Sequence, residues 1–299
     1  MNNDRIQEIL DLMEEARLDY FLISDPQSIA YCTGYYNDPH ERMFVFMISK
    51  HGNHTLFMND LFYLDHDLDV NIVWHKDGQD AIQTIVDEMH FPGRIGIDKN
   101  WASHFLLDLM KKLPDAKYIN ASPCVDLVRM KKDLQEQVLM IESSKINDAV
   151  MEEIIPFIQE GVTEKQLAKK LDELFFNHHS TCYGAIVAFG KNAADPHHEN
   201  DDILLRKGDC VLIDMGCVYK GYCSDMTRTF FYEGILEEEI KVYEIVKKAN
   251  EAAEAMIKPG VKLSDIDKCA RKVISDEGYG KYFTHRLGHF IGRDVHEYG

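Results

Sequence analysis

Two aspartates each belong to a short run of β-branched and aromatic residues, Asp214 in VLIDMG and Asp225 in GYCSDMTRTF. The stretch between them contains Gly216 and Gly221, which suit a tight connection. This pattern predicts two adjacent strands that bring two carboxylates to one place. Like charges held that close raise each other's pKa unless a cation neutralises them. The pattern therefore predicts a bound metal ion.

A single aspartate at the end of a strand is more often a turn former or a helix cap than a metal ligand. The context favours a metal site here. VLIDMG is an apolar strand that ends in an acid, and SDMTRTF continues as a strand whose hydroxyl groups can orient ligands. Far downstream, His289 lies between glycines in LGHFIG and His296 lies in VHE. Together these residue types can build a metal centre.

The motifs LIDMG, YCSDMTRTF and GHFIG, in this order, resemble the metal-binding strands of the metallopeptidase family that contains prolidases, aminopeptidase P and methionine aminopeptidase. The fold of that family is known as pita-bread. NAADPHHE, which contains His197, and VHEYG, which contains His296, are similar to its two substrate-side histidine segments. SDPQSIAYCTGY, DPHERMF and HGNHTLFM resemble the amino-terminal domain of prolidase-type members. The resemblance therefore covers the whole chain.

The resemblance implies two divalent metal ions held by Asp214, Asp225 and His289, with Asp225 as the bridging ligand. Carboxylate-rich ligation favours manganese or cobalt over a thiolate-selected metal. His197 and His296 are implied to contact the substrate. One of them would lie near the carbonyl oxygen as it becomes an oxyanion, and the other near the leaving imide nitrogen or the terminal carboxylate.

The family has two further glutamate ligands, the first in an EPG segment, and neither has a counterpart up to Gly299. Residues 136–299 are therefore expected to form a pita-bread domain truncated at its C-terminal end, and the 299-residue chain is expected to bind metal weakly and to be inactive. Glu297 belongs to the VHEYG match and is expected to be local structure. Phe290 stands where the family has a small residue, and it is expected to narrow the pocket.

The activity implied by the resemblance is metal-dependent hydrolysis of the peptide bond preceding proline in Xaa-Pro dipeptides. Proline has no N–H to donate, so selectivity must come from the shape of its ring. An Xaa-Pro aminopeptidase acting on longer peptides is one alternative. A non-catalytic pita-bread protein that binds peptides or proteins is another, and a metal-free amidinohydrolase of the creatinase type is a third. The retained acids argue against the last two, because buried charges are costly to keep.

Composition limits the partners and the compartment. The formal charge of −18 argues against nucleic acid or an anionic membrane as a partner. No run is long and apolar enough to span a bilayer, and the amino-terminal MNNDRIQEILDLMEEARLDYF has the pattern of an acidic amphipathic helix. The seven cysteines include no CxxC pair and are expected to be reduced thiols. We expect a cytoplasmic enzyme with a small peptide substrate, and the resemblance implies a homodimer.

Alternating patterns predict an α/β domain over residues 1–122, with helices at 6–17, 81–89 and 104–113 and strands at 20–24, 43–49, 54–58 and 94–98. The pattern is expected to break at Pro123, and residues 123–135 are expected to be a linker. Residues 136–299 are expected to be an α+β pita-bread catalytic domain. Within the second half, helices are expected at 128–158, 164–176, 237–256 and 263–277, with strands at 185–190, 210–216 and 221–231 and a final strand near the histidines. Thr163 and Gln166 have the form of a capping box and are interpreted as structural.

Overall fold

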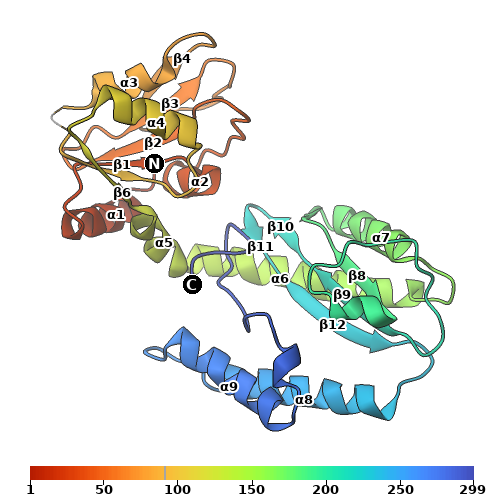
Figure 1. The fold of residues 1–299 in the computed structure, drawn as a ribbon. Coiled ribbons are helices and arrows are strands. Elements are labelled where there is room, and N and C mark those ends of the chain that lie inside the picture. The colour runs from red at the N-terminus through yellow and green to blue at the C-terminus, as the bar shows by residue number, and fades with distance from the viewer. Residues whose placement is uncertain (91) are drawn as a thin grey trace. The chain divides into compact units, whose positions relative to one another are not determined.

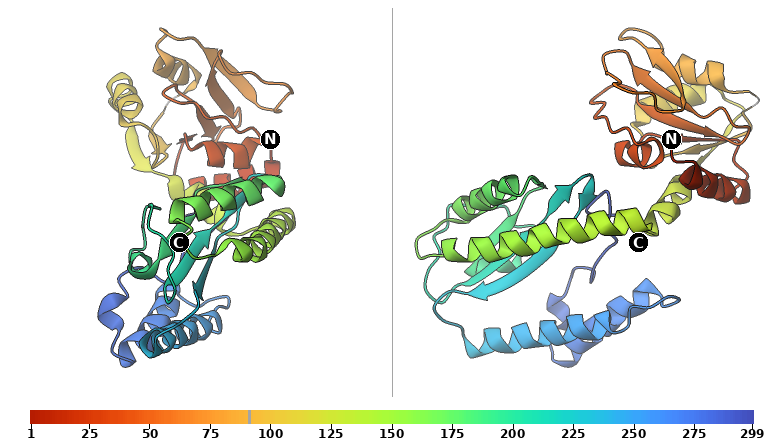
Figure 2. Two further views of the ribbon diagram at one scale, coloured as in Figure 1. Left: turned by 90° about the vertical axis from the view of Figure 1, so that its right-hand side faces the viewer. Right: turned by 180° about the vertical axis from the view of Figure 1, so that it is seen from behind.

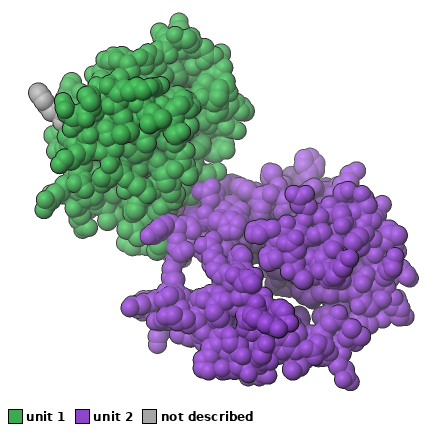
Figure 3. Space-filling view, in the orientation of Figure 1, with its two compact units in different colours: residues 1–131 green, residues 132–299 purple. Residues whose placement is uncertain are grey.

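The computed structural model describes residues 1–90 and 92–299, and it divides into two compact units, Met1–Lys131 and Lys132–Gly299 (Figure 3). This division falls inside residues 123–135, the expected linker. Each unit contains its own clusters of buried apolar side chains. None of the helices in the described ranges combines the length and the apolar character needed to cross a membrane.

Unit 1 is a six-stranded mixed sheet in the order β4-β3-β2-β1-β5-β6 with helices on both faces (Figures 1 and 2). Its strands are β1 (Tyr20–Ile23), β2 (Val45–Ser49), β3 (Thr55–Asn59), β4 (Asn71–His75), β5 (Arg94–Ile97) and β6 (Lys117–Asn120). Its helices are α1 (Asn3–Glu15), α2 (Pro26–Thr33), α3 (Ala81–Glu88), α4 (Ser103–Lys112) and α5 (Ser122–Met130).

Strand β1 explains why this sheet needs two layers of helices. Phe21 and Ile23 belong to the apolar cluster built with α1, α2 and α5. Tyr20 and Leu22 belong to a second cluster built with α3 and α4. Successive side chains of a strand point to opposite faces, so a strand that is apolar throughout must be covered on both. The predicted α/β architecture of the first domain is confirmed.

The prediction of a break at Pro123, followed by one helix through residues 128–158, is wrong. Helix α5 begins at Ser122 and places Pro123 in its first turn. A proline is tolerated there because the first N–H groups of a helix have no helical acceptor in any case. The chain leaves the helix after Met130 and enters α6 (Leu134–Ile154) at the N-cap Asp133, which forms a capping box with Glu136.

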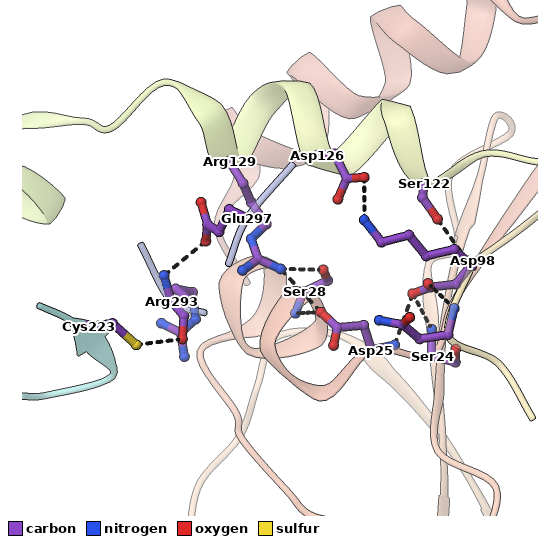
Figure 4. Close-up of polar contacts among 12 residues, drawn as sticks. Ser24, Asp25, Ser28, Asp98, Ser122, Asp126, Arg129, Cys223, Arg293 and Glu297 are labelled. Carbon is purple, nitrogen blue, oxygen red and sulfur yellow. Dashed lines mark hydrogen bonds and ion pairs between the residues drawn. The ribbon is translucent and has the colours of Figure 1, made fainter. Parts of the chain in front are cut away.

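Polar side chains hold α5 to the carboxyl ends of β1 and β5 (Figure 4). The buried Asp98 accepts hydrogen bonds from the backbone N–H groups of Ser24 (3.1 Å) and Asp25 (2.9 Å), and burial raises its pKa. From α5, Arg129 binds the Asp25 carboxylate at 3.2 Å and the Ser28 hydroxyl at 2.9 Å. These contacts place the last helix of unit 1 against the sheet.

Unit 2 is built on two small sheets, one in the order β12-β9-β8 and one in the order β11-β10-β7. Its strands are β7 (Thr181–Cys182), β8 (Ile186–Phe189), β9 (Cys210–Met215), β10 (Cys217–Tyr219), β11 (Tyr222–Cys223) and β12 (Met226–Phe231). Its α-helices are α6, α7 (Glu164–Asn177), α8 (Glu237–Glu254) and α9 (Leu263–Asp276), and its 3-10 turns are η1 (Ile155–Phe157), η2 (Gly190–Ala194) and η3 (Gly280–Tyr282). Helices α8 and α9 pack on each other, on the opposite side of the β12-β9-β8 sheet from α7 (Figures 1 and 2).

The expected final strand near the histidines is not formed in the described chain. Only an isolated bridge joins Phe290 to Glu297, whose N–H donates to the Phe290 carbonyl at 2.9 Å. The segment is held instead by single contacts, such as the hydrogen bond from the Cys223 N–H to the Gly292 carbonyl at 2.7 Å. Strand assignment needs a ladder of neighbouring pairs, and the backbone here turns too often to supply one.

Two local predictions are confirmed. The Thr163 hydroxyl accepts from the Gln166 N–H and the Gln166 side chain accepts from the Thr163 N–H, which completes the capping box at the start of α7. Glu297 accepts a hydrogen bond from the Arg293 N–H at 2.9 Å (Figure 4) and pairs with Lys132 at 2.8 Å. Its carboxylate therefore serves local structure.

Gly216 lies at a close approach that no other residue type fits. A Cβ built there would lie 1.8 Å from the Tyr183 hydroxyl and 2.1 Å from the Ser224 carbonyl oxygen. We predict that Gly216→Ala lowers stability by about 1–3 kcal/mol, the usual cost of overpacking. Gly234→Ala is the control, because its Cβ would meet only ordinary contacts, from 3.5 Å. Thermal melts of both variants measure this, and equal melting temperatures would contradict it.

Candidate metal centre

Strand β9 directs Asp214 away from the apolar core. Val211, Ile213 and Met215 are buried in the cluster shared with α6 and α7. Asp214 alternates with them along the strand and is half-buried. Because side chains of a strand alternate between its two faces, the carboxylate lies on the face opposite that core.

Strand pairing brings Asp225 to the same face. β9 and β12 are antiparallel neighbours, and Thr227 is the partner of Asp214. Asp225 precedes Thr227 by two residues, so it has the same parity. The predicted adjacency of the two aspartate segments is confirmed, with a small β10–β11 hairpin inserted between them. That hairpin turns at Lys220 and Gly221, which both have positive φ.

The side chains of the site meet in pairs. The His289 Nε2 lies 3.4 Å from Asp225 Oδ2, and these two side chains are 15% and 30% exposed. The Thr227 hydroxyl donates to Asp214 Oδ1 at 2.8 Å and orients that carboxylate. The rings of His289 and His296 lie 4.2 Å apart between centroids.

The electrostatics of the site favour a cation. Burial raises the pKa of Asp225, and the nearby Asp214 charge raises it further. His289 and His296 lower it, without cancelling the increase. Two carboxylates and one imidazole are donors that suit a divalent metal ion, which would neutralise the repulsion between the acids. Asp214, Asp225 and His289 therefore fit the metal that their sequence motifs predict.

These three side chains are not the tightest group of possible ligands in the described chain. Within residues 1–90 and 92–299, three such side chains have donor atoms that all lie within 4.8 Å of one another only at Glu164, His198 and Asp201. Asp214, Asp225 and His289 were the predicted ligands, and the structure gathers them around Asp225. Glu164 and its neighbours were not predicted as a site.

The two predicted substrate histidines lie in different surroundings. His296 is next to His289, and loss of hydration together with the nearby His289 and Arg286 lowers its pKa. It is therefore neutral at pH 7. His197 lies in the loop between η2 and β9, is exposed, and has its ring centroid 6.2 Å from that of His285. In the described ranges, no hydrogen bond or ring contact joins His197 to the predicted ligands.

Tyr183 is a site residue that the sequence analysis did not identify. Its hydroxyl donates to the Ser224 carbonyl at 2.9 Å, directly before Asp225. Burial raises its pKa strongly, and the charges of Asp225 and Asp214 add to this effect. Its position in the sequence could have indicated it, because Tyr183 lies just before the predicted strand AIVAF. That strand is β8, which pairs with β9, the strand that carries Asp214.

Two cavities border His289. One of about 300 Å³ reaches Asp225 and has lining residues from α6, β11 and the histidine segment: Met140, Ser144, Cys223, Ser224, Asp225, Gly288, His289 and Ile291. The other, about 750 Å³, lies mainly between α8, α9 and residues 286–290, and Phe290 lines this one. Asp225 and His289 therefore meet at the smaller cavity.

Comparison with known proteins decides the family. Residues 138–299 match metallopeptidase family M24, and residues 5–131 match the creatinase/prolidase N-terminal domain. The chain belongs to metallopeptidase family M24. An uncharacterized peptidase of Staphylococcus aureus is 32% identical over 98% of this chain and 85% of the relative.

Solved structures of a dipeptidase and a prolidase share the fold. A dipeptidase from Pyrococcus horikoshii is 35% identical with a TM-score of 0.89, over 99% of this chain and 84% of that one. A prolidase from Thermococcus sibiricus is 30% identical with a TM-score of 0.93, over 100% of this chain and 84% of that one. The predicted combination of a creatinase-type amino-terminal domain and a pita-bread domain is confirmed.

We predict that Asp225→Asn raises the melting temperature of the metal-free M24 chain at pH 7. The raised pKa means that the carboxylate lowers stability as pH rises from the unfolded value of 3.8 through the folded value, so ionised Asp225 destabilises the fold at pH 7. The amide removes that charge. The difference should shrink as pH falls toward 4.

Added Mn²⁺ provides the second readout of this variant. It should raise the melting temperature of the parent protein by mass action and leave Asp225→Asn unchanged, because a neutral amide oxygen is a poor substitute for a carboxylate ligand. Thermal melts with and without metal measure both effects. An equal metal-induced shift in parent and variant would show that Asp225 is a structural residue.

Proposed function

We propose that this M24 metallopeptidase hydrolyses the peptide bond preceding proline in Xaa-Pro dipeptides. The observation that carries the proposal is the meeting of Asp214, Asp225 and His289, since Asp225 and His289 also line the 300 Å³ cavity. The likeness to a dipeptidase and a prolidase supports the substrate class. Met140 and Ile291 give that cavity apolar walls, which suit a pyrrolidine ring without an N–H donor.

Asp214, Asp225 and His289 would hold the divalent ions. When bound, such ions supply a water nucleophile of lowered pKa and a Lewis acid for the scissile carbonyl. Thr227 keeps the Asp214 carboxylate oriented through its hydroxyl. Tyr183 anchors the backbone directly before Asp225. The protein contribution is thus a preorganised set of donors on two paired strands.

The histidines act on the substrate in this proposal. His296, kept neutral by its lowered pKa, can donate or accept one hydrogen bond at the reacting group. His197 would make the second contact from its loop, at the developing oxyanion or at the leaving imide nitrogen. Manganese or cobalt as the ions, a small peptide as the partner, a homodimer and a cytoplasmic location belong to the same proposal, and the carboxylate-rich donor set supports the metals.

A substrate panel tests the reaction. With added Mn²⁺ or Co²⁺, we predict that a form of the protein carrying the two further glutamate ligands turns over Leu-Pro on the order of 1–10³ s⁻¹. The kcat/KM for Leu-Pro should exceed that for Leu-Ala, which has a secondary amide, and that for Leu-Pro-Gly, which lacks the terminal carboxylate at proline. Preference for the tripeptide would make the protein an Xaa-Pro aminopeptidase. Full metal content without turnover on any peptide would make it a binding protein.

Substitution of the histidines separates ligands from substrate contacts. We predict that His289→Ala loses bound metal, whereas His197→Ala and His296→Ala keep it and lower kcat by about 10²-fold, the low end for an acid–base or oxyanion group. His51→Ala, an exposed histidine of unit 1, is the control. Elemental analysis and steady-state kinetics of the four proteins measure this. Equal metal loss in the three site variants would show that the roles are misassigned.

A further inference from the structure

Glu164 is a fully buried carboxylate that the proposed reaction does not use. It lies at the first position of α7 and has no exposed surface. Its Oε1 accepts from the Phe189 N–H at 2.8 Å and from the Asn192 side chain at 3.0 Å. Its Oε2 accepts from His198 Nε2 at 2.6 Å and from the Asp201 N–H at 3.0 Å. Four donors from residues 189–201 therefore converge on this carboxylate.

The same side chains include the tight group of potential ligands, yet the hydrogen bonds argue against a metal there. A carboxylate offers about four lone-pair sites, and Glu164 uses them on four donors. Asp201 is also engaged, since its Oδ1 accepts from the Ile203 N–H at 2.7 Å. A cation would have to displace bonds that are already made. The hydrogen bonds of this group therefore hold residues 189–201 against the start of α7.

The four donors bracket His197. They come from residues 189–201, and His197 lies within that segment next to His198. The His198 side chain is only 12% exposed where it meets Glu164, whereas His197 is exposed. Asp195 supports the turn that carries both histidines. Its Oδ1 accepts a hydrogen bond from the His197 N–H at 3.0 Å, and its carbonyl oxygen accepts one from the His198 N–H at 3.2 Å. Because the His198 side chain is anchored inside the protein, the preceding side chain, His197, is directed toward the surface.

We propose that Glu164 and His198 form a positioning latch that holds the loop of His197 in its substrate-facing conformation. This proposal rests on the proposed function, in which His197 contacts the substrate. In the described ranges, neither latch residue forms a hydrogen bond or ion pair with Asp214, Asp225 or His289. Their effect passes through the backbone of residues 189–201, where an error of about 1 Å in the place of a reacting group can cost 10²-fold in rate.

The test is a double-mutant cycle between His198 and His197. His198→Ala should lower kcat by about 10-fold or more at unchanged metal content, and His198→Gln, which keeps a side-chain N–H for Glu164, should restore most of it. In the His197→Ala background, His198→Ala should cost less than about 2-fold, because residues that act through one another are non-additive. KM should change less than kcat, since the contact strengthens in the transition state.

His178→Ala is the matched control. His178 also follows α7 and also pairs with a glutamate, Glu153, at 2.9 Å, but that pair lies on the surface away from the loop. This variant should keep the parent kcat. Equal kcat losses from His198→Ala in both backgrounds would overturn the latch and leave a general structural role. Loss of a metal equivalent in His198→Ala would overturn it in favour of a metal site.

Hydrogen exchange gives a readout that needs no activity. His198→Ala should speed amide exchange in residues 190–202 and leave β9 and β12 at the parent rate. His178→Ala should leave residues 190–202 unchanged. If the parent protein hydrolyses no peptide, the proposed function fails, and exchange alone decides the latch. Unchanged exchange in this segment of His198→Ala would overturn it whether or not the parent is active.

Discussion

The antiparallel pairing of β9 with β12 is the interaction on which the rest of the site depends. It sets Thr227 opposite Asp214 and gives Asp225 the same parity, so two acids share one face of the sheet. A slip of one residue would turn one acid into the apolar core. The raised pKa of Asp225 shows that this arrangement carries a cost when no cation is bound. The sheet therefore creates the electrostatic demand that a divalent ion satisfies.

The opposite face of the same sheet holds this register in place. Val211, Ile213 and Met215 pack with α6 and α7, and a register slip would expose them. The inserted β10–β11 hairpin is anchored separately, since the Tyr222 hydroxyl donates to the buried Glu136 at 2.9 Å. The segment that joins the two acids is therefore fixed both at the strands and at the hairpin. Because it turns tightly between them, its backbone comes close to neighbouring atoms at position 216, where the residue is a glycine.

Helices and strands with a strong apolar pattern could be predicted from the sequence. The prediction failed for elements whose structure depends on contacts with other segments. The buried strands β1, β2, β3, β8 and β9 were all identified. The edge strands β4 and β6 were not, because their side chains are largely half-exposed and carry little periodic signal. Pro123 was read as a break although it opens a helix. The final strand near the histidines was predicted from the apolar residues of that segment. It does not form, because the backbone hydrogen bonds of the segment go to β11 and to residues within one short turn.

The same distinction applies to the site. Residues recognisable by their type could be predicted, and residues recognisable only by their contacts could not. Asp214, Asp225 and His289 could be named from motif and resemblance because their chemistry is visible in single letters. Tyr183 and the Glu164–His198 contact could not, since each joins segments far apart in sequence. Ligands on paired strands inherit their precision from the sheet, whereas His197 lies on a loop and needs its own support. A buried carboxylate that accepts from four donors of residues 189–201 supplies that support, and it lets metal binding and substrate positioning change independently.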